Sequence, residues 1–533
     1  MARSPLVPLA VFVFTALALL PNLGGEHVWS KDEARDGLVA RDMVEMGHWL
    51  IPHMGGRVYP YKPPLFHWLV GLSSPRGVTE WSLRFPSVLA AAAVVALTYA
   101  MGARLATPVT GLVAAAMLAS SATFVEWART GRLEMLLVLW LTLGFWSAQR
   151  WLDAGKRRYV LVFGLALGLG CLTKGPVGLA PLGALIVALA LFRRWSRRDV
   201  ADLGLALALA VALPVAWLGL AASAHAGVNE YLKVVVANLA TEVRALRHQH
   251  PLFAAEAIGV GFLPWTLVLP GAVAVLVRRW RASWRVLVLP LLWVGGVLVP
   301  FTLFISPRAV HFLPIYPALA LCVAWAWSAG SIQERRWMTY PLVLAVIAFA
   351  VAAVGLAIRP LTIESNGHLT VFSRAVGIGV AVIAGAAGLG VAALVRRRRT
   401  DAVPVVVGAG ALLAMVLLHV TVYTPRVNRA YPMREVAARF VAMLPEGAQL
   451  EYVDLRFSTA LMFYVQKRPI ARPWVTAISD PADHPRRYAV IPHDVMALLW
   501  GECPRLPQPL REETIFGGRY VLLDLQKAGR HCF

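Results

Sequence analysis

Long apolar runs alternate with short polar connections over the first 424 residues of the chain. An α-helix of about 20 apolar residues crosses the ~30 Å hydrocarbon core of a bilayer. The pattern therefore predicts an all-α polytopic membrane domain at 1–424 with about 13 spans. Their expected limits are 5–22, 84–105, 108–126, 133–150, 158–172, 176–192, 201–222, 253–277, 286–305, 312–330, 339–358, 374–395 and 403–422.

Two features of this span list leave alternatives open. The first run follows a basic start but no small-residue cleavage site follows it, so we interpret it as an uncleaved span and not a signal peptide. The runs 158–172 and 176–192 flank Thr173-Lys174-Gly175-Pro176 and are either two spans or one broken helix.

Basic residues gather in every second connection between the predicted spans. The clusters are Arg104; Arg150 with Lys156, Arg157 and Arg158; Arg193, Arg194, Arg197 and Arg198; Arg278, Arg279, Arg281 and Arg285; Arg335 and Arg336; and Arg396 to Arg399. Cytoplasmic connections carry an excess of Lys and Arg. The alternation predicts a cytoplasmic N-terminus, which places the loop 24–80 and the segment after 424 on the periplasmic face of a bacterial inner membrane.

Composition supports a membrane protein and excludes other classes. The chain of 533 residues is 58% hydrophobic and only 15% charged, with a mean hydropathy of +0.63. A soluble domain would be about a quarter charged. The net charge of +22 does not indicate nucleic-acid binding, because the basic residues lie between apolar runs and form no continuous face.

The polar segment 425–533 is expected to be a small periplasmic α/β domain. Arg434–Met443 has helical apolar spacing after a proline, and Leu450–Val453, Tyr488–Ile491 and Tyr520–Leu525 have the pattern of short strands. Cys503 and Cys532 lie in this segment and form either a disulfide or two free thiols. Cys171 and Cys322 lie in apolar runs and are interpreted as packing residues.

The loop 24–80 is rich in ionisable residues and is predicted to lie beside the bilayer. Charged groups are costly there, so we expect them to have a function. Asp32 and Glu33 follow the first span, and paired carboxylates suit general-base chemistry. A structural alternative is a capping box, with Ser30 at the helix start and Glu33 three residues on. The residues after it, 34–46, have the spacing of an amphipathic helix lying in the interface.

Lys62 precedes two prolines in the sequence Tyr59-Pro60-Tyr61-Lys62-Pro63-Pro64. The prolines restrict the backbone around Lys62. A lysine held at the membrane edge suits a phosphate ligand, and the alternative is snorkelling of its ammonium to the headgroups.

These motifs, taken together, resemble the GT-C glycosyltransferases that use polyprenyl-phosphate sugars. The resemblance is to the aminoarabinose transferases of lipid A and, more distantly, to protein O-mannosyltransferases. It rests on Asp32-Glu33 with Arg35, on Tyr61-Lys62-Pro63-Pro64-Leu65, and on four later motifs. These are Ala128-Arg129 with Arg132-Leu133-Glu134, Leu172-Thr173-Lys174-Gly175-Pro176, Gly261-Phe262-Leu263-Pro264-Trp265 and Leu313-Pro314-Ile315-Tyr316-Pro317.

The resemblance implies three groups of site residues. The catalytic group is Asp32, Glu33 and Glu134. The cations implied for the carrier phosphate are Arg35, Lys62, Lys174 and Arg308. The substrate cavity is implied to include Tyr59, Tyr61, Arg129, Asn238, His250, His311 and Tyr316. Purely structural roles are the alternatives for two of these residues. Glu134 could pair with Arg129 or Arg132, and Lys174 could cap a broken helix.

One departure from the family pattern concerns metal use. The family commonly has Glu where this chain has Tyr61, which removes a carboxylate that could bind a metal or the sugar. His53, His67 and His311 show no helical ligand spacing. The metal requirement is therefore open, and a divalent ion is the one cofactor considered.

The function implied is sugar transfer from an undecaprenyl-phosphate carrier to a lipid A or other lipid, glycan or protein acceptor. Direct displacement would invert the anomeric centre. The alternatives are protein O-mannosylation and a transporter or flippase for lipid-linked sugars. A transporter usually places charges near the midplane and shows inverted repeats, whereas here the charges lie at one interface.

Overall fold

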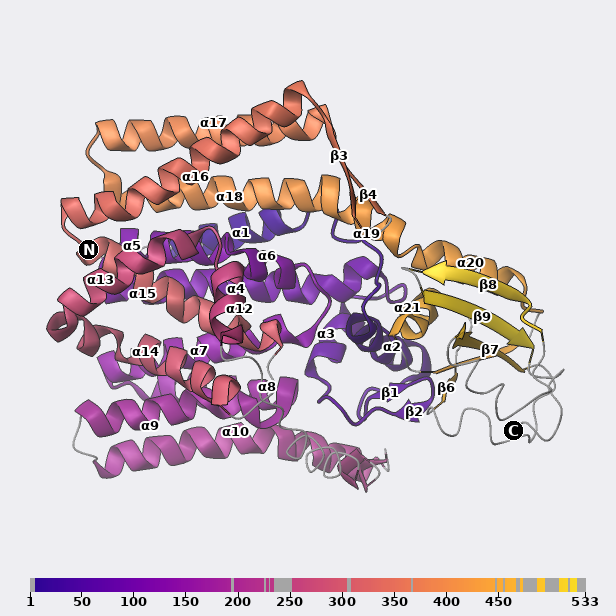
Figure 1. The fold of residues 1–533 in the computed structure, drawn as a ribbon. Coiled ribbons are helices and arrows are strands. Elements are labelled where there is room, and N and C mark those ends of the chain that lie inside the picture. The colour runs from indigo at the N-terminus through magenta and orange to yellow at the C-terminus, as the bar shows by residue number, and fades with distance from the viewer. Residues whose placement is uncertain are drawn as a thin grey trace.

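The structure is a computed structural model that describes residues 5–192, 196–224, 227–229, 231–233, 252–303, 308–365, 368–445, 448–453, 456–465, 470–472, 487–493, 508–515 and 518–524. A bundle of long, roughly aligned helices forms one part, and a small mixed sheet lies beyond one end of it (Figure 1). The loop between the first two bundle helices lies at that same end, next to the sheet.

The bundle contains the following elements in chain order: α1 (Leu6–Leu19), α4 (Glu80–Leu105), α5 (Pro108–Ala119), α6 (Ala122–Ala128), α7 (Leu133–Ala154), α8 (Arg157–Lys174), η1 (Gly175–Leu179), α9 (Ala180–Phe192), α10 (Arg197–Ser223), α12 (Phe253–Gly261), η2 (Trp265–Val268), α13 (Leu269–Arg278), α14 (Trp280–Leu303), η3 (Ala309–Ile315), α15 (Tyr316–Ala329), α16 (Ile332–Ile358), α17 (Arg374–Arg396), η4 (Thr400–Ala402) and α18 (Val403–Leu418). The hairpin β3 (Leu361–Ser365) and β4 (His368–Phe372) joins α16 to α17.

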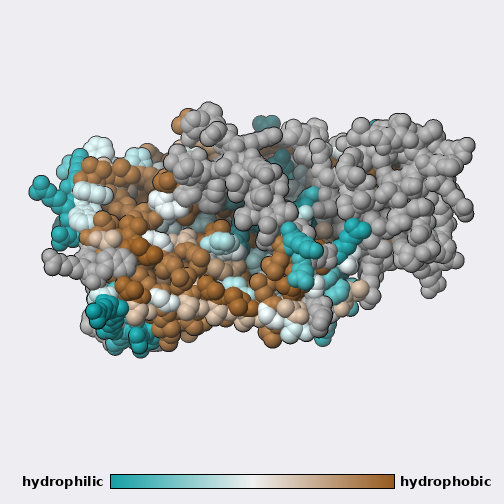
Figure 2. Space-filling view, turned by 90° about the horizontal axis from the view of Figure 1, so that it is seen from below, coloured by the Kyte–Doolittle hydropathy of each residue, from teal (hydrophilic) through white to brown (hydrophobic). Residues whose placement is uncertain are grey.

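On the face seen in Figure 2, apolar side chains cover most of the described middle of the bundle, and hydrophilic side chains gather toward its ends. Within the described residues, seven helices are long and apolar enough to cross a membrane, or up to nine if each of two bent helix pairs is one span. The chain is therefore a multi-pass membrane protein, while the count of about 13 stays a prediction.

The helices on either side of Lys174 are two separate elements. Helix α8 ends at Lys174 and α9 begins at Ala180, after the short helix η1. Leu185 of α9 lines the same small pocket as Val160 near the start of α8. The first half of α9 therefore lies near the first turn of α8, and the stretch Arg157–Leu191 counts as one of the seven membrane-spanning segments.

The first loop folds into α2 (Lys31–Met46), the short hairpin β1 (His53–Met54) with β2 (Arg57–Val58), and α3 (Leu65–Leu72). The Ser30 hydroxyl accepts a hydrogen bond from the Glu33 amide at 3.2 Å, which satisfies one of the free donors at the start of α2. Gly47 ends the helix with a φ of +73°, a conformation that glycine adopts without strain. The predicted helix start is confirmed, but α2 packs against both α3 and α21 (Arg456–Tyr464) and is covered by protein on these sides.

The C-terminal unit follows α18 without a break in helical structure. It comprises η5 (His419–Tyr423), α19 (Thr424–Ala430), α20 (Met433–Ala442), β5 (Gln449–Val453), α21, β6 (Ile470–Arg472), β7 (Arg487–Pro492), β8 (Arg511–Ile515) and β9 (Gly518–Asp524). The strand order is β6-β5-β7-β9-β8, parallel among β6, β5 and β7 and antiparallel among β7, β9 and β8. The predicted helix and three strands correspond to α20, β5, β7 and β9, whereas α21, β6 and β8 were not predicted.

Candidate active site

Asp32 accepts from guanidinium groups on three separate parts of the chain. Its Oδ2 lies 3.1 Å from Nη1 of Arg308 and 3.3 Å from Nη1 of Arg132. Its Oδ1 lies 3.4 Å from Nη1 of Arg35, one turn later on α2. The Asp32 side chain is still 30% exposed. A charged carboxylate that is both held and accessible is the arrangement that a reacting group requires.

Glu134 lies in the first turn of α7 and is buried between two cations. Its Oε1 is 3.2 Å from Nη2 of Arg132 and 3.4 Å from Nζ of Lys174, at the end of α8. Its Oε2 is buried and has no hydrogen-bond donor among the described residues. Arg132 thus bridges Asp32 and Glu134, and Glu134 keeps one oxygen available for a further donor.

Lys62 lies in the connection between β2 and α3, and its side chain is half-buried. Burial lowers the pKa of its ammonium from the ordinary value, and the neighbouring Lys174 ammonium lowers it further. Glu134 and Asp36 act in the opposite direction. Lys62 therefore belongs electrostatically to the same cluster as Lys174, although these residues are far apart in the sequence.

The cluster as a whole carries more positive than negative charge. Its five cationic side chains are Arg35, Lys62, Arg132, Lys174 and Arg308. The carboxylates that face them are Asp32 and Glu134, together with Asp36, which pairs with His67. All of these cations except the exposed Arg308 are at least half-buried. Such a surplus of cations at the end of a membrane bundle is suited to an anion such as a phosphate.

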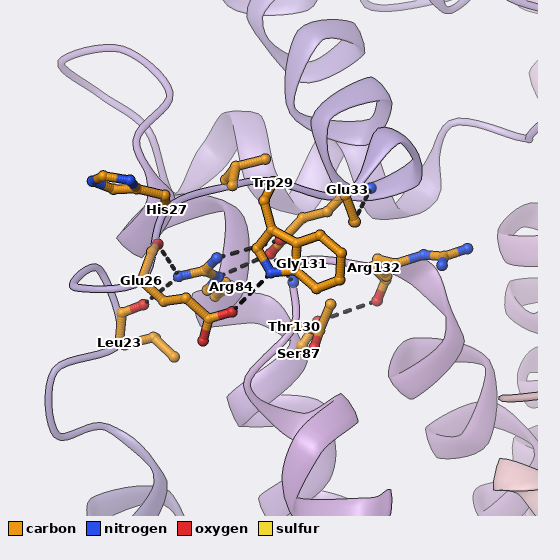
Figure 3. Close-up of polar contacts among 12 residues, drawn as sticks. Leu23, Glu26, His27, Trp29, Glu33, Arg84, Ser87, Thr130, Gly131 and Arg132 are labelled. Carbon is orange, nitrogen blue, oxygen red and sulfur yellow. Dashed lines mark hydrogen bonds and ion pairs between the residues drawn. The ribbon is translucent and has the colours of Figure 1, made fainter. Parts of the chain in front are cut away.

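Glu33 is turned away from this cluster and into the protein. Its Oε1 accepts from Arg84 Nε and from the Gly131 amide, each at 2.8 Å, and its Oε2 lies 3.3 Å from Arg84 Nη2 (Figure 3). Arg84 also donates to the carbonyls of Leu23 and Glu26 at 3.0 and 2.8 Å. The predicted capping box is therefore half formed, because the Glu33 carboxylate pairs with Arg84 instead of the helix start. This position favours a structural role for Glu33 over a catalytic one.

Two other residues predicted for the site, Arg129 and Tyr316, make structural contacts elsewhere in the bundle. Arg129 is buried and donates to the carbonyls of Leu19 and, at 2.8 Å, Pro21, just after α1. Tyr316 is fully buried at the start of α15, where its hydroxyl donates to the Ala257 carbonyl at 3.3 Å. Neither side chain lies in the cation cluster. The alternative pairing of Glu134 with Arg132 is present, and that with Arg129 is not.

The remaining predicted residues fall around the cluster or outside the described chain. The His311 ring nitrogen Nδ1 accepts from the Arg308 amide at 3.1 Å. Tyr59 is buried and Tyr61 is exposed, with ring centroids 5.2 Å apart. Asn238, His250, Cys503 and Cys532 lie outside the described residues. Cys171 and Cys322 are free cysteines, as expected for packing residues.

Two features of the site were not predicted from the sequence. Arg132 was considered only as a pairing partner of Glu134 and not as a site residue, although it joins both carboxylates. The buried pair between Asp36 Oδ1 and His67 Nε2, at 2.9 Å, was not predicted at all. The spacing of Asp36 four residues after Asp32 places both on one face of α2 and was the available signal.

A metal ion has no obvious set of ligands in the described part of the chain. No group of three or more His, Cys, Asp and Glu side chains there is arranged to hold one. The carboxylates that would serve, Asp32 and Glu134, each already face cations. No step proposed below depends on a metal.

Comparison with known protein structures shows the fold. Two crystal structures of ArnT from Cupriavidus metallidurans match this structure with a TM-score of 0.73. The alignment with the apo form covers 98% of each chain at 18% sequence identity. The second structure is of the same protein bound to undecaprenyl phosphate, and the alignment covers 99% of this chain and 100% of that one. The chain therefore has the fold of these ArnT structures.

Sequence comparisons agree with this fold and support a glycosyltransferase. A family model described as dolichyl-phosphate-mannose-protein mannosyltransferase matches residues 61–218. The undecaprenyl phosphate-alpha-4-amino-4-deoxy-L-arabinose arabinosyl transferase of Pectobacterium carotovorum subsp. carotovorum is 29% identical over 387 residues, 68% of each chain. The transferase of the same name from Pseudomonas aeruginosa is 31% identical over 340 residues, 61% of this chain and 60% of that one. The resemblance to GT-C glycosyltransferases, predicted from the sequence, is confirmed.

Proposed function

We propose that this chain is a bacterial inner-membrane glycosyltransferase that moves a sugar from an undecaprenyl-phosphate carrier to lipid A or a similar lipid acceptor. The observation that supports this proposal is the surplus of cations around Asp32 and Glu134 at one end of a membrane bundle, where Arg132 and Lys174 are largely buried and Arg308 is exposed. A lipid-linked phosphate reaches this position with its chain in the bilayer and its sugar at the interface. The similarity to arabinosyl transferases that are named for undecaprenyl phosphate supports the same carrier.

The cations stabilise the leaving group in the proposed reaction. As the acceptor hydroxyl attacks the anomeric carbon, the bond from that carbon to the phosphate oxygen breaks and negative charge develops on the phosphate. Lys62, Lys174 and Arg308 are cations on separate elements that would bind this charge. Because Lys174 and Arg308 are already paired with Glu134 and Asp32, they need little reorganisation during the reaction.

Asp32 is the proposed base that accepts the proton of the acceptor hydroxyl. Its side chain is 30% exposed against 6% for Glu134, so an acceptor reaches it more readily. Glu134 would instead orient the sugar, with Oε2 accepting from a sugar hydroxyl. One displacement with no covalent intermediate inverts the anomeric centre, and a product with retained configuration would contradict this mechanism.

The proposed orientation places the site in the periplasm. The basic clusters in alternate connections support a cytoplasmic N-terminus. The transmembrane domain would then be residues 1–424, with its periplasmic loop at 24–80, and residues 425–533 would form a periplasmic domain. A reporter fused after Arg399 should be cytoplasmic, and a periplasmic reporter there would overturn the orientation.

Protein O-mannosylation is the second candidate, because the mannosyltransferase family model matches residues 61–218. A flippase is less well supported, because the charges gather at the end of the bundle and not near its middle. Protein O-mannosylation predicts a glycosylated protein, and a flippase predicts no sugar transfer by this chain. The identity of the glycosylated product therefore separates the three candidates.

The decisive experiment is mass spectrometry of envelope lipids, glycans and proteins from a deletion strain complemented with wild type or Asp32→Asn. Wild type should restore one sugar on a lipid. Asp32→Asn should lower turnover by about 10²- to 10⁴-fold, because the amide cannot accept the proton. Full restoration of the product by Asp32→Asn would exclude Asp32 as the base. Restoration of a glycoprotein and no glycolipid would favour the second candidate.

A further inference from the structure

Helix α2 carries two neighbouring stripes of residues, each spaced four apart. Asp32 and Asp36 form one stripe and face the cation cluster and His67. Glu33, Gly37 and Arg41 form the other. Successive residues in an α-helix are about 100° apart, so the two stripes lie side by side. Rotation of α2 about its axis would therefore move both stripes together.

Arg41, the last residue of the second stripe, contacts the last turn of α21 in the C-terminal unit. Nη1 of Arg41 donates to the carbonyls of Met462 and Val465, each at 3.2 Å, and its Nη2 donates to the Phe463 carbonyl. The last carbonyls of a helix lack partners within the helix and favour a nearby cation. Arg41 thus caps α21 across a sequence separation of more than 420 residues.

Helix α21 also lies directly against the backbone of α2. A Cβ atom added at Gly37 would lie 2.5 Å from Cε2 of Phe463 and 3.1 Å from Cδ2 of Leu83. The neighbouring Tyr464 hydroxyl accepts from the Val28 amide at 2.7 Å, in the segment that leads into α2. The last turn of α21 therefore contacts α2 at Gly37, at Arg41 and just before its start.

We propose that the C-terminal unit positions the reaction site through this contact. The capped end of α21 sets the rotation of α2 about its axis and so holds Asp32 against Arg132 and Arg308. Arg41 is a positioning residue, since its guanidinium binds the end of α21 and pairs with Glu45 one turn later on α2. The expected effect on catalysis rests on the proposed function. The contact by which α21 fixes the orientation of α2 does not depend on it.

The test uses the full-length chain with Arg41→Met, which keeps the length of the side chain but removes its donors. Hydrogen exchange of the peptide covering residues 31–46 should become about tenfold faster, because α2 loses the hydrogen bonds that the charged Arg41 donates to carbonyls of α21. Turnover should fall about 10²-fold through misplacement of Asp32. Affinity for undecaprenyl phosphate should fall much less than turnover, because Lys62, Lys174 and Arg308 lie on other elements and only Arg35 belongs to α2. Arg41→Lys should restore part of the turnover.

The matched control is Arg439→Met. Arg439 lies on α20 and binds Glu513 of β8 at 2.7 Å, so this variant removes an arginine within the C-terminal unit away from α2. It should leave exchange in residues 31–46 and turnover within about twofold. If Arg41→Met does not fold, Gly37→Ala replaces it, because the added methyl pushes the Phe463 ring, and Phe463→Leu should relieve the effect.

Each outcome decides the inference. Unchanged exchange in residues 31–46 of Arg41→Met would show that α21 does not hold α2. Faster exchange with normal turnover would show that the contact does not position Asp32, as would an equal loss of turnover in Arg439→Met. A wild-type chain that transfers no sugar would instead overturn the proposed function, and the exchange measurements would still decide whether α21 holds α2.

Discussion

Glu134 and Glu334 are matched carboxylates in two different surroundings. Glu134 belongs to the cluster formed with the first loop, whereas α16, in whose first turn Glu334 lies, begins at the end of the bundle away from the sheet (Figure 1). Each lies in the first turn of a helix, and each faces two cationic side chains. Glu334 pairs with Arg278 at 3.5 Å and with Arg279 at 3.3 Å, and these two arginine side chains are 70% and 41% exposed. Exposed pairs of this kind contribute about 0–1 kcal/mol, because water and salt screen them.

The two cations that face Glu134 are much less exposed. The side chains of Arg132 and Lys174 are 14% and 20% exposed, and both belong to a larger cluster with surplus positive charge. Charges that water reaches poorly act strongly on a bound anion. The comparison shows that burial of the paired cations, and not the number of ion pairs or the surplus of positive charge, distinguishes Glu134 from Glu334 among the basic connections at the other end.

The largest effect that would test this comparison is expected for Arg132→Met. This change removes the cation shared by Asp32 and Glu134 and leaves both carboxylates under-compensated. We expect kcat/KM for the lipid-linked sugar to fall by about 10²- to 10³-fold. Steady-state kinetics in detergent would measure it. A loss below about threefold would mean that burial of the cation has no catalytic consequence.

Lys62→Ala should have the next largest effect, on binding of the carrier. A hydrogen bond from a charged group contributes about 1.5–3 kcal/mol, which corresponds to about 10- to 100-fold in affinity. Titration calorimetry with undecaprenyl phosphate would measure the change. Unchanged affinity would indicate that the Lys62 ammonium serves the lipid headgroups and not the carrier phosphate.

The pH dependence of carrier binding should sharpen the assignment of Lys62. Burial and the Lys174 ammonium lower the Lys62 pKa below its ordinary 10.5, and only the protonated form binds phosphate. Affinity should therefore be complete below the Lys62 pKa and fall as the pH rises through it. In Lys62→Arg the decline should move to higher pH, because arginine stays charged. The same alkaline profile in both proteins would assign the titration to another group.

The smallest effect is expected for Arg278→Met, the counterpart of Arg132→Met at the other end of the bundle. Glu334 keeps Arg279 and the amide of Ser331 as partners, the latter at 2.7 Å. Turnover should stay within about twofold and stability should change by at most about 1 kcal/mol. A loss of turnover comparable to that of Arg132→Met would remove the distinction between the two ends.

The sequence predicted the local features of the fold well. Apolar runs of membrane-spanning length, the helix start at Ser30, and the secondary structure at α20, β5, β7 and β9 all follow from local patterns. The strand β8, of sequence Arg-Glu-Glu-Thr-Ile, was missed because it is polar and pairs only with β9 at the sheet edge.

The partners of charged residues were much harder to predict. Asp32 and Glu33 are adjacent and equally acidic, yet one faces three guanidinium groups and the other is buried against Arg84. Neighbouring residues on a helix point about 100° apart, so they meet different elements. Nothing local in the sequence states which element that will be.

By itself, the sequence determined a multi-pass membrane protein with its unusual charges in one loop and a polar C-terminal segment, because hydrophobicity and charge act locally along the chain. The tertiary structure decided which of those charges meet. It brought Arg132, Lys174 and Arg308 to the start of α2 and placed the end of α21 on Arg41. Contacts between residues hundreds of positions apart depend on how helices pack, and packing depends on the shapes of whole elements.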